Sequence, residues 1–208
     1  MTGPPVLLCD LDGVLVASTA AIARVYRAWA GRHGLDPALV VETAQGRPSW
    51  EVVQICAPEL DAAAESALID AAHVADQDRV VAIAGAFELL SQTPPGRLAV
   101  VTSGSGALAA ARFAAAGLPA PHVLVTADQI ARGKPDPEGY LRAAALLGAA
   151  PGDCVVLEDA PAGVKAGFAA GMHVIAVLTS HPPASLAGAD AFVYDLTEVP
   201  EIAARLVG

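Results

Sequence analysis

Short apolar runs alternate with alanine-rich stretches through the second half of the chain, beginning at Arg97. The apolar runs are RLAVVTS, HVLVTAD, CVVLED and HVIAVL, and the stretches between them are GALAAARFAAAG, PEGYLRAAALLG and PAGVKAGFAAG. Runs of this length that are rich in valine, leucine and isoleucine are typical of buried strands, whereas the intervening stretches favour helices. The alternation predicts an α/β fold with a doubly wound parallel sheet and right-handed crossovers.

Glycines mark the expected ends of the helices. Gly117, Gly148 and Gly171 each end one of the alanine-rich stretches, and glycine readily adopts the left-handed conformation that terminates many helices. The segment PPVLLCD near the N-terminus then reads as an isolated first strand of the same sheet.

Residues 16–81 have helical periodicity without a strand pattern. One helical face is expected to contain Ile22, Tyr26, Trp29 and His33. Ser49 is expected to cap a further helix, whose apolar positions are Trp50, Val53 and Cys56. Both tryptophans lie in this segment. They could contact a substrate, but we expect them to pack in the core, which is the more common role of buried aromatic residues. The sequence therefore predicts a helical insertion after the first strand.

Composition narrows the class of protein. Hydrophobic residues make up 54% of the 208, but alanine accounts for much of this, and no apolar run approaches the roughly 20 residues of a membrane span. The N-terminal segment has no basic region before its apolar run, so we expect a strand there and a cytoplasmic protein. The three cysteines form no zinc or disulfide pattern and are expected to be buried: Cys9, Cys56 and Cys154.

The net charge of −10 argues against nucleic-acid or membrane partners, which select basic surfaces. Ten of the twelve basic residues are arginine, and the two lysines are Lys134 and Lys165. A chain that prefers arginine so strongly is expected to keep lysine where a compact ammonium group is required. A phosphate ligand would need such a local positive charge.

The first predicted strand ends in Asp10-Leu11-Asp12-Gly13. Ligands of an open parallel sheet bind outside the carboxyl ends of its strands. Two aspartates two positions apart can both face that crevice when the backbone turns out of the sheet, which Gly13 permits. The same residue types are common in plain turns, so the pair is informative only together with the other strand ends.

The later strands lead to complementary groups. Thr102 and Ser103 precede a predicted helix, where hydroxyls and backbone N–H groups bind an anion or simply cap the helix. Lys134 lies in the loop GKPDP, where it could supply positive charge to a phosphate. A solvated surface lysine is the simpler interpretation. Glu158 and Asp159 follow a buried strand, where an acidic pair needs a cation. Together these groups predict an oxygen cage for Mg²⁺ and a cradle for phosphate.

Four segments, DLDGVL, VTSGS, GKPDPEGY and VVLEDAPAGVKAG, resemble in order the four motifs of the haloacid dehalogenase (HAD) superfamily. The chain resembles the branch with a helical cap after the first strand. AQGRPSW, VTSGS and EDAPAG are similar to small sugar-phosphate and glycerol-phosphate phosphatases, which are related to β-phosphoglucomutase. The resemblance implies a phosphatase with a Rossmann-like catalytic core at 1–15 and 82–208 and a helical cap domain at 16–81.

The resemblance also implies roles for individual residues. Asp10 would be the catalytic nucleophile that forms a phosphoaspartate, and Asp12 would act as general acid and base. The Mg²⁺ ligands would be the Asp10 carboxylate, the Asp12 carbonyl and Asp159. Glu158 would orient a metal-bound water from the second shell of the site.

Phosphate binding is assigned in the same way to Thr102, the N–H group of Ser103 and Lys134. In the cap, Arg47 is expected either to bind substrate oxygens or to be a solvated loop residue. Ala17 stands where many relatives have aspartate, so any role of that carboxylate in the cap hinge or in mutase chemistry is absent.

The favoured function is a Mg²⁺-dependent phosphatase that acts on a small phosphorylated metabolite, as a monomer or weak dimer. A phosphomutase of the β-phosphoglucomutase type shares the core, but its cap lysine has no counterpart here. A dehalogenase lacks the aspartate that Asp12 supplies. A noncatalytic regulator that binds a phosphorylated ligand would not need the full catalytic set intact: Asp10, Asp12, Lys134 and Asp159. Lys165 is assigned no role.

Overall fold

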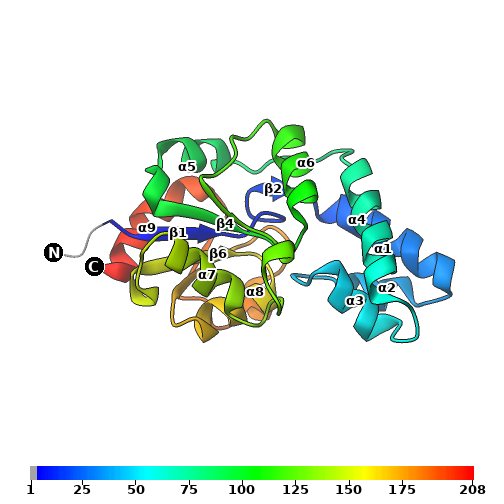
Figure 1. The fold of residues 1–208 in the computed structure, drawn as a ribbon. Helices are drawn as coiled ribbons and strands as arrows, with labels where there is room; N and C mark the ends of the chain where they lie inside the picture. The colour runs from blue at the N-terminus through cyan, green and yellow to red at the C-terminus, as the bar shows by residue number, and fades with distance from the viewer. Residues whose placement is uncertain (1–3) are drawn as a thin grey trace.

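The computed structural model describes residues 4–208 and shows an α/β core beside a group of helices (Figure 1). The core contains a six-stranded sheet with the order β5-β4-β1-β6-β7-β8, in which every neighbouring pair is parallel. Its strands are β1 (Val6–Cys9), β4 (Leu98–Val101), β5 (Val123–Val125), β6 (Cys154–Glu158), β7 (His173–Val177) and β8 (Ala191–Val193). The predicted α/β fold with a parallel sheet is confirmed.

Helices cover both faces of the sheet, which explains why its strands read as continuous apolar runs. The helices on one face are α5 (Ala86–Gln92), α6 (Gly106–Ala116) and α9 (Val199–Val207). Those on the other face are α7 (Glu138–Leu146) and α8 (Pro161–Ala169). Alternate residues of β1 follow this division, since Leu7 and Cys9 join the first apolar cluster and Val6 and Leu8 join the second.

The order of the strands reverses direction at β1. From β1 the sheet extends through β4 and β5 on one side and through β6, β7 and β8 on the other. Such a switch leaves a crevice at the carboxyl ends of the central strands. Short 3-10 helices occur in the connections, at Pro95–Arg97, Ala127–Gln129, Pro151–Asp153, Pro183–Leu186 and Leu196–Glu198.

The predicted glycine signals are confirmed. Gly117, Gly148 and Gly171 lie at the ends of α6, α7 and α8 with φ values of 64°, 65° and 72°. This left-handed conformation lets the chain leave each helix and enter the next connection.

Four helices follow β2 (Val16–Ala17), which pairs in antiparallel orientation with β3 (Val81–Ala82). They are α1 (Thr19–His33), α2 (Pro37–Thr43), α3 (Ser49–Cys56) and α4 (Ala62–Ala75). We call residues 18–80 the helical insert. It encloses an apolar cluster of its own that includes Tyr26, Trp29, Val53 and Ile69, and it lies beyond the carboxyl ends of the strands (Figure 1).

The aromatic face predicted for the insert lies on α1. Tyr26 and Trp29 are buried, and Ile22 packs against the same cluster. The Trp29 ring N–H donates to Glu65 Oε2 at 2.8 Å, and His33 Nε2 lies 3.1 Å from the same oxygen. Core packing therefore accounts for Trp29.

The predicted helix cap at Ser49 is wrong. Pro48 occupies the cap position of α3, and no side chain caps this helix. Ser49 is the first helical residue, and its hydroxyl donates to Asp70 Oδ1 on α4 at 2.5 Å. The Tyr26 hydroxyl lies 3.4 Å from the same Ser49 oxygen. Packing between helices therefore decides the role of this hydroxyl.

The cysteines are unpaired within the described residues, and Cys9 and Cys154 are buried as predicted, whereas Cys56 is half-buried. Among residues 4–208 we find no helix with the length and apolar character that a membrane span requires.

Candidate active site

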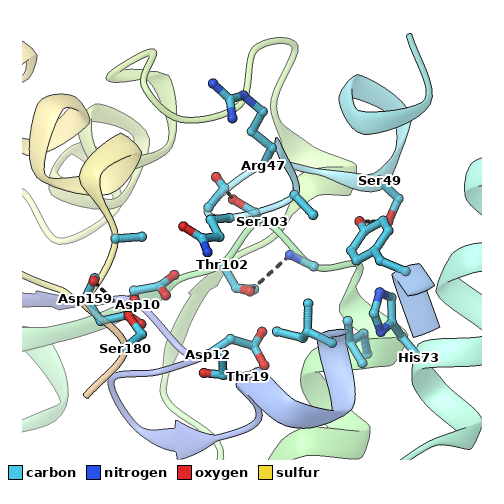
Figure 2. Close-up of a pocket in the computed structure, with 18 of the residues that line it drawn as sticks. Asp10, Asp12, Thr19, Arg47, Ser49, His73, Thr102, Ser103, Asp159 and Ser180 are labelled. Atoms are coloured by element: carbon cyan, nitrogen blue, oxygen red, sulfur yellow. Dashed lines mark hydrogen bonds between the residues drawn. The ribbon is translucent and has the colours of Figure 1, made fainter. Parts of the chain in front are cut away.

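The carboxyl ends of three adjacent strands meet at one edge of the sheet (Figure 2). Asp10 follows β1, Thr102 follows β4 and Asp159 follows β6, and β4 and β6 flank β1. A pocket opens between this edge and the insert. Side chains from both sides line it, among them Asp10, Asp12, Thr102, Ser103, Asp159, Tyr26, Gln45, Arg47, Ser49 and His73.

Asp10 and Lys134 form a buried ion pair. Lys134 Nζ donates to Asp10 Oδ1 at 2.6 Å, and the second Asp10 oxygen has no hydrogen-bond partner among residues 4–208. Burial raises the pKa of the Asp10 carboxyl well above its usual value, and the Lys134 ammonium opposes this rise. Burial also works against the ammonium, but the carboxylates of Asp10 and Glu158 outweigh it and raise the pKa of Lys134. Lys134 therefore stays protonated and places an ammonium group beside the first strand end.

Glu158 is completely buried, and protein groups occupy both of its oxygens. Oε1 lies 2.6 Å from Lys134 Nζ and accepts a hydrogen bond from the Tyr140 hydroxyl at 2.7 Å. Oε2 accepts from the backbone N–H groups of Asp159 and Ala160, at 3.1 and 3.3 Å. The role of Glu158 in orienting a metal-bound water stays a prediction. Its carboxylate is committed to Lys134 and to the backbone.

Asp10, Glu158 and Asp159 form a cluster in which one oxygen of each lies within 4.8 Å of the others. Burial, followed by the neighbouring Glu158 carboxylate, raises the pKa of Asp159 to about 7. Three buried carboxylates share one ammonium, so ionising all of them without a further cation is unfavourable, and a divalent cation would supply the missing positive charge. Carboxylate oxygens are the ligands that hard cations prefer. The donor set therefore fits a metal ion of this type.

Gly13 allows the chain to pass close to this cluster. Its φ is +87°, and a Cβ atom placed there would lie 1.9 Å from Asp159 Oδ2. Only a residue without a side chain fits, because any Cβ would displace the Asp159 carboxylate. The glycine of the DLDG segment is thus required by packing against the third strand end as well as by the turn.

Asp12 lies beside the pocket and accepts two hydrogen bonds on Oδ1. One comes from the Ser18 hydroxyl, and the other comes from Arg112 Nε at 3.0 Å. Arg112 is fully buried on α6 and belongs to no motif that marks it in the sequence. Its burial could have been inferred from its position, because it lies four residues after Leu108 and next to Phe113. Both of these residues lie on the buried face of this alanine-rich helix.

The loop between β4 and α6 contains two of the three residues predicted to bind phosphate, Thr102 and Ser103. Thr102 is buried, and its hydroxyl accepts a hydrogen bond from the Gly104 N–H at 3.1 Å. The hydroxyl of Ser103 donates to the Gly46 carbonyl of the insert at 2.8 Å. Ser105 caps α6 by accepting from the Leu108 N–H at 3.3 Å. The helix N-terminus therefore lies beside the strand end that bears Thr102.

Side chains that sequence reasoning missed connect the insert to the core. His181 Nε2 lies 2.6 Å from Gln45 Oε1, and His181 Nδ1 lies 2.9 Å from the Asp159 carbonyl. Glu51 Oε1 accepts a hydrogen bond from the Gly133 N–H at 2.7 Å, immediately before Lys134. These residues are far apart in the sequence and have no motif, so only their packing reveals the contacts. The insert is held against the strand ends.

Arg47 lies at the rim of this pocket. Its Nη1 donates to the Thr43 carbonyl at 2.8 Å, and its guanidinium points away from Asp10 and Asp12 (Figure 2). The structure therefore places Arg47 beside the site without a contact to the strand-end groups. Lys165 is exposed on α8.

The insert lines the far side of the pocket with apolar residues such as Ile22 and with three polar side chains, those of Tyr26, Ser49 and His73. His73 is buried, packs edge-on against Tyr26 at 5.1 Å between ring centroids, and has no hydrogen-bond partner for Nδ1 within the described residues. Burial, followed by the charge of Arg112, lowers the pKa of His73 to about 4. The ring is therefore neutral at neutral pH, and it offers a hydrogen-bonding edge beside the hydroxyls of Tyr26 and Ser49.

A model of the haloacid dehalogenase-like hydrolases matches residues 5–171. The chain belongs to this family. It is 43% identical to hexitol phosphatase A of Escherichia coli (strain K12) over 197 residues, which cover 92% of this chain and 91% of that relative. It is 39% identical to validoxylamine A 7'-phosphate phosphatase of Streptomyces hygroscopicus subsp. limoneus, with 93% and 95% covered. The predicted HAD family and enzyme class, a HAD-type phosphatase, are confirmed.

The fold is also similar to that of a hydrolase from Pseudomonas syringae. The TM-score is 0.85 at 24% sequence identity, and the match covers 95% of this chain and 99% of the other. At this identity the likeness concerns the fold alone. The helical insert and the parallel sheet therefore belong to one shared architecture.

Proposed function

We propose that this HAD-type phosphatase hydrolyses a small sugar or polyol phosphate through a phosphoaspartate on Asp10, with Mg²⁺ as cofactor. The observation that supports this most directly is the placement of Asp10. Its carboxylate lies at the end of the central strand, is paired on one oxygen with Lys134, and faces the pocket that Asp12 also lines. A buried carboxylate with an adjacent cation and an adjacent second carboxylate is the arrangement that covalent phosphoryl transfer requires.

In the first half-reaction an Asp10 oxygen attacks phosphorus in line with the departing ester oxygen. The bond between phosphorus and the leaving group breaks, and protonated Asp12 gives its proton to the alkoxide. In the second half-reaction Asp12 takes a proton from water as the water oxygen attacks phosphorus. The bond to Asp10 then breaks, and phosphate and free Asp10 are restored. Each proton that Asp12 gives in the first step is regained in the second.

The remaining strand-end groups bind and orient the phosphoryl group. Lys134, the Thr102 hydroxyl and the Ser103 N–H would bind the phosphoryl oxygens, on which negative charge is redistributed in the transition state. Asp10, the Asp12 carbonyl and Asp159 would hold Mg²⁺. When bound, this ion would offset the charge of the carboxylates and of the phosphate.

The insert is proposed to act as a cap domain, with boundaries near 16 and 81, that excludes water from the reaction. The leaving group would lie against the polar side chains of Tyr26, Ser49 and His73 on the insert side of the pocket. These groups can hydrogen-bond the hydroxyls of a polyol or sugar, and a 43% identical relative is a hexitol phosphatase. We therefore expect hexitol and sugar phosphates as substrates. The phosphomutase alternative is less favoured because neither of the two lysines lies in the insert. The cytoplasmic location and the monomer or weak dimer stay predictions.

Phosphate release from hexitol, sugar and glycerol phosphates tests this function. We expect Mg²⁺-dependent hydrolysis of at least one of these substrates, suppressed by EDTA and by Ca²⁺, whose looser coordination misaligns the attack. Asp10→Asn should form no phosphoenzyme. Asp12→Asn should keep the nucleophile but turn over about 100-fold more slowly or worse. Asp153→Asn, at an exposed aspartate, is the control. Covalent phosphate and turnover in Asp10→Asn, or full activity after removal of metal, would refute the proposal.

A further inference from the structure

Arg112 connects the pocket to the exit from the insert. Its Nε donates to Asp12 Oδ1 at 3.0 Å. Its Nη1 donates to Gln77 Oε1 at 2.9 Å and to the Asp76 carbonyl at 3.3 Å. Asp76 and Gln77 belong to the return segment, residues 76–80, through which the chain leaves α4 and re-enters the core. One fully buried arginine therefore binds both the carboxylate beside the pocket and the return segment.

The return segment is in turn bonded to helices of the insert. Asp76 accepts hydrogen bonds from Arg24 of α1, with Nε at 2.9 Å and Nη2 at 2.8 Å. The side-chain nitrogen of Gln77, Nε2, donates to the His73 backbone carbonyl of α4 at 2.7 Å. A rotation of the insert would therefore move both residues that hold the outer end of Arg112.

The first connection between core and insert also ends on Asp12. Ser18 lies immediately before α1, and its hydroxyl donates to the same Oδ1 atom that accepts from Arg112. Asp12 Oδ1 thus receives one donor from the first connection, Ser18, and one from Arg112 of α6, which in turn binds the return segment. Asp12 Oδ2 has no hydrogen-bond partner in the described part of the chain. This division leaves one carboxylate oxygen available for proton transfer in the pocket.

We propose that Arg112 is a positioning residue that couples the placement of the insert to the orientation of Asp12. This inference rests on the proposed function. With the return segment as it lies in this structure, the planar guanidinium is fixed at both ends and holds the carboxylate with one oxygen free. When the insert moves away, Asp76 and Gln77 withdraw, and Arg112 loses the contacts that orient it. Proton transfer by Asp12 is then confined to the state in which the insert covers the site.

A purely structural role for Arg112 predicts a different kinetic pattern. The departing alkoxide of a hexitol phosphate needs a proton from Asp12, whereas p-nitrophenolate leaves without one. Hydrolysis of the phosphoaspartate needs Asp12 as a base with either substrate. Misplacing Asp12 therefore slows phosphorylation by the hexitol phosphate and slows dephosphorylation, but it spares phosphorylation by p-nitrophenyl phosphate. General loosening of the fold slows all three steps alike.

Two variants separate these cases. Arg112→Lys keeps the positive charge but cannot bind Asp12, Asp76 and Gln77 together. Gln77→Leu removes a contact at the outer end and leaves the pair between Arg112 and Asp12 in place. Arg142→Lys, at an exposed position of α7, is the matched control. Rapid-quench measurements of phosphoenzyme with a hexitol phosphate and with p-nitrophenyl phosphate give the rates, and thermal melting reports folding.

We expect Arg112→Lys to slow phosphorylation by the hexitol phosphate and dephosphorylation by about 10-fold or more, within the range of acid–base catalysis. A burst of p-nitrophenolate at nearly the unmodified rate should precede slow turnover. Gln77→Leu should slow the same two steps by a smaller factor. If Arg112→Lys does not fold, the kinetics of Gln77→Leu alone test the coupling. Equal slowing of all steps, or unmodified kinetics in Gln77→Leu, would overturn the coupling. Absence of phosphoenzyme in the unmodified protein would instead refute the proposed function.

Discussion

Lys134 Nζ lies 2.6 Å from Asp10 Oδ1, so the loop after β5 is bonded to the end of the central strand. The same ammonium lies 2.6 Å from Glu158 Oε1 at the end of β6. All three groups are buried. Burying charges is costly and is offset only by close pairing with good geometry. Lys134 therefore both stabilises the acidic strand ends and supplies positive charge beside the pocket.

Replacing Lys134 with methionine should damage stability and activity together. It leaves two buried carboxylates without a cation, so the free energy of unfolding should fall by about 3 to 5 kcal/mol. The kcat/KM value should fall by about 100-fold or more, because a charged group aimed at the phosphoryl oxygens is lost. Urea denaturation and phosphate release measure the two effects. Lys165→Met, at the exposed lysine, should change neither, and an active Lys134→Met protein would contradict the role given to this residue.

A methyl group at Gly13 should disturb metal binding specifically. Because the Cβ would lie 1.9 Å from Asp159 Oδ2, Gly13→Ala should displace that carboxylate and weaken Mg²⁺ binding by about 10-fold or more, as for other perturbed metal ligands. Calorimetric titration with Mg²⁺ measures the affinity. Gly96→Ala, where nothing lies within 4 Å of the added Cβ, is the control. Unchanged Mg²⁺ affinity in Gly13→Ala would exclude Asp159 as a ligand.

Arg47 should matter for substrates that reach the insert. If its guanidinium turns from the Thr43 carbonyl to a substrate oxygen, Arg47→Ala should lower kcat/KM for the hexitol phosphate by about 10-fold, as expected for one charged hydrogen bond. The loss should be much smaller for p-nitrophenyl phosphate. Steady-state kinetics with both substrates, beside Arg27→Ala at an exposed position of α1, tests this. Equal losses of kcat/KM with both substrates would indicate general phosphate binding. No loss with either would mean that Arg47 is a solvated loop residue without a role in substrate binding.

His73 should make the protein less stable in mild acid. Its pKa is about 4 in the folded state, against 6.5 for an unperturbed histidine, so the unfolded state binds the proton more tightly. The folded state is therefore not penalised above about pH 6.5, and its stability falls as the pH drops toward 4. The loss from His73 should reach about 2 kcal/mol near pH 5. Denaturation across this range should show a shallower slope for His73→Gln than for His122→Gln, whose histidine is exposed. Identical slopes would contradict a buried neutral ring.

The fold class and the residues at the strand ends could be predicted from the sequence alone. Continuous apolar runs, glycine helix ends and the DLDG turn depend on residues within one element, so they are readable without a structure. Because parallel strands end at one edge of the sheet, Asp10, Thr102 and Asp159 could be expected to meet. That local reasoning failed at Ser49, where packing against Asp70 replaces the predicted cap.

Only the tertiary structure decided which groups orient those residues. Arg112 is separated from Asp12 by 100 positions, and His181 is separated from Gln45 by 136. In the sequence Arg112 is one polar residue in an alanine-rich helix, and the buried state of its guanidinium depends on how α6 packs beneath the insert. Glu158 likewise binds Lys134 and Tyr140 because three separate segments converge. Such contacts are set by the packing of whole elements, which no local pattern of residues encodes.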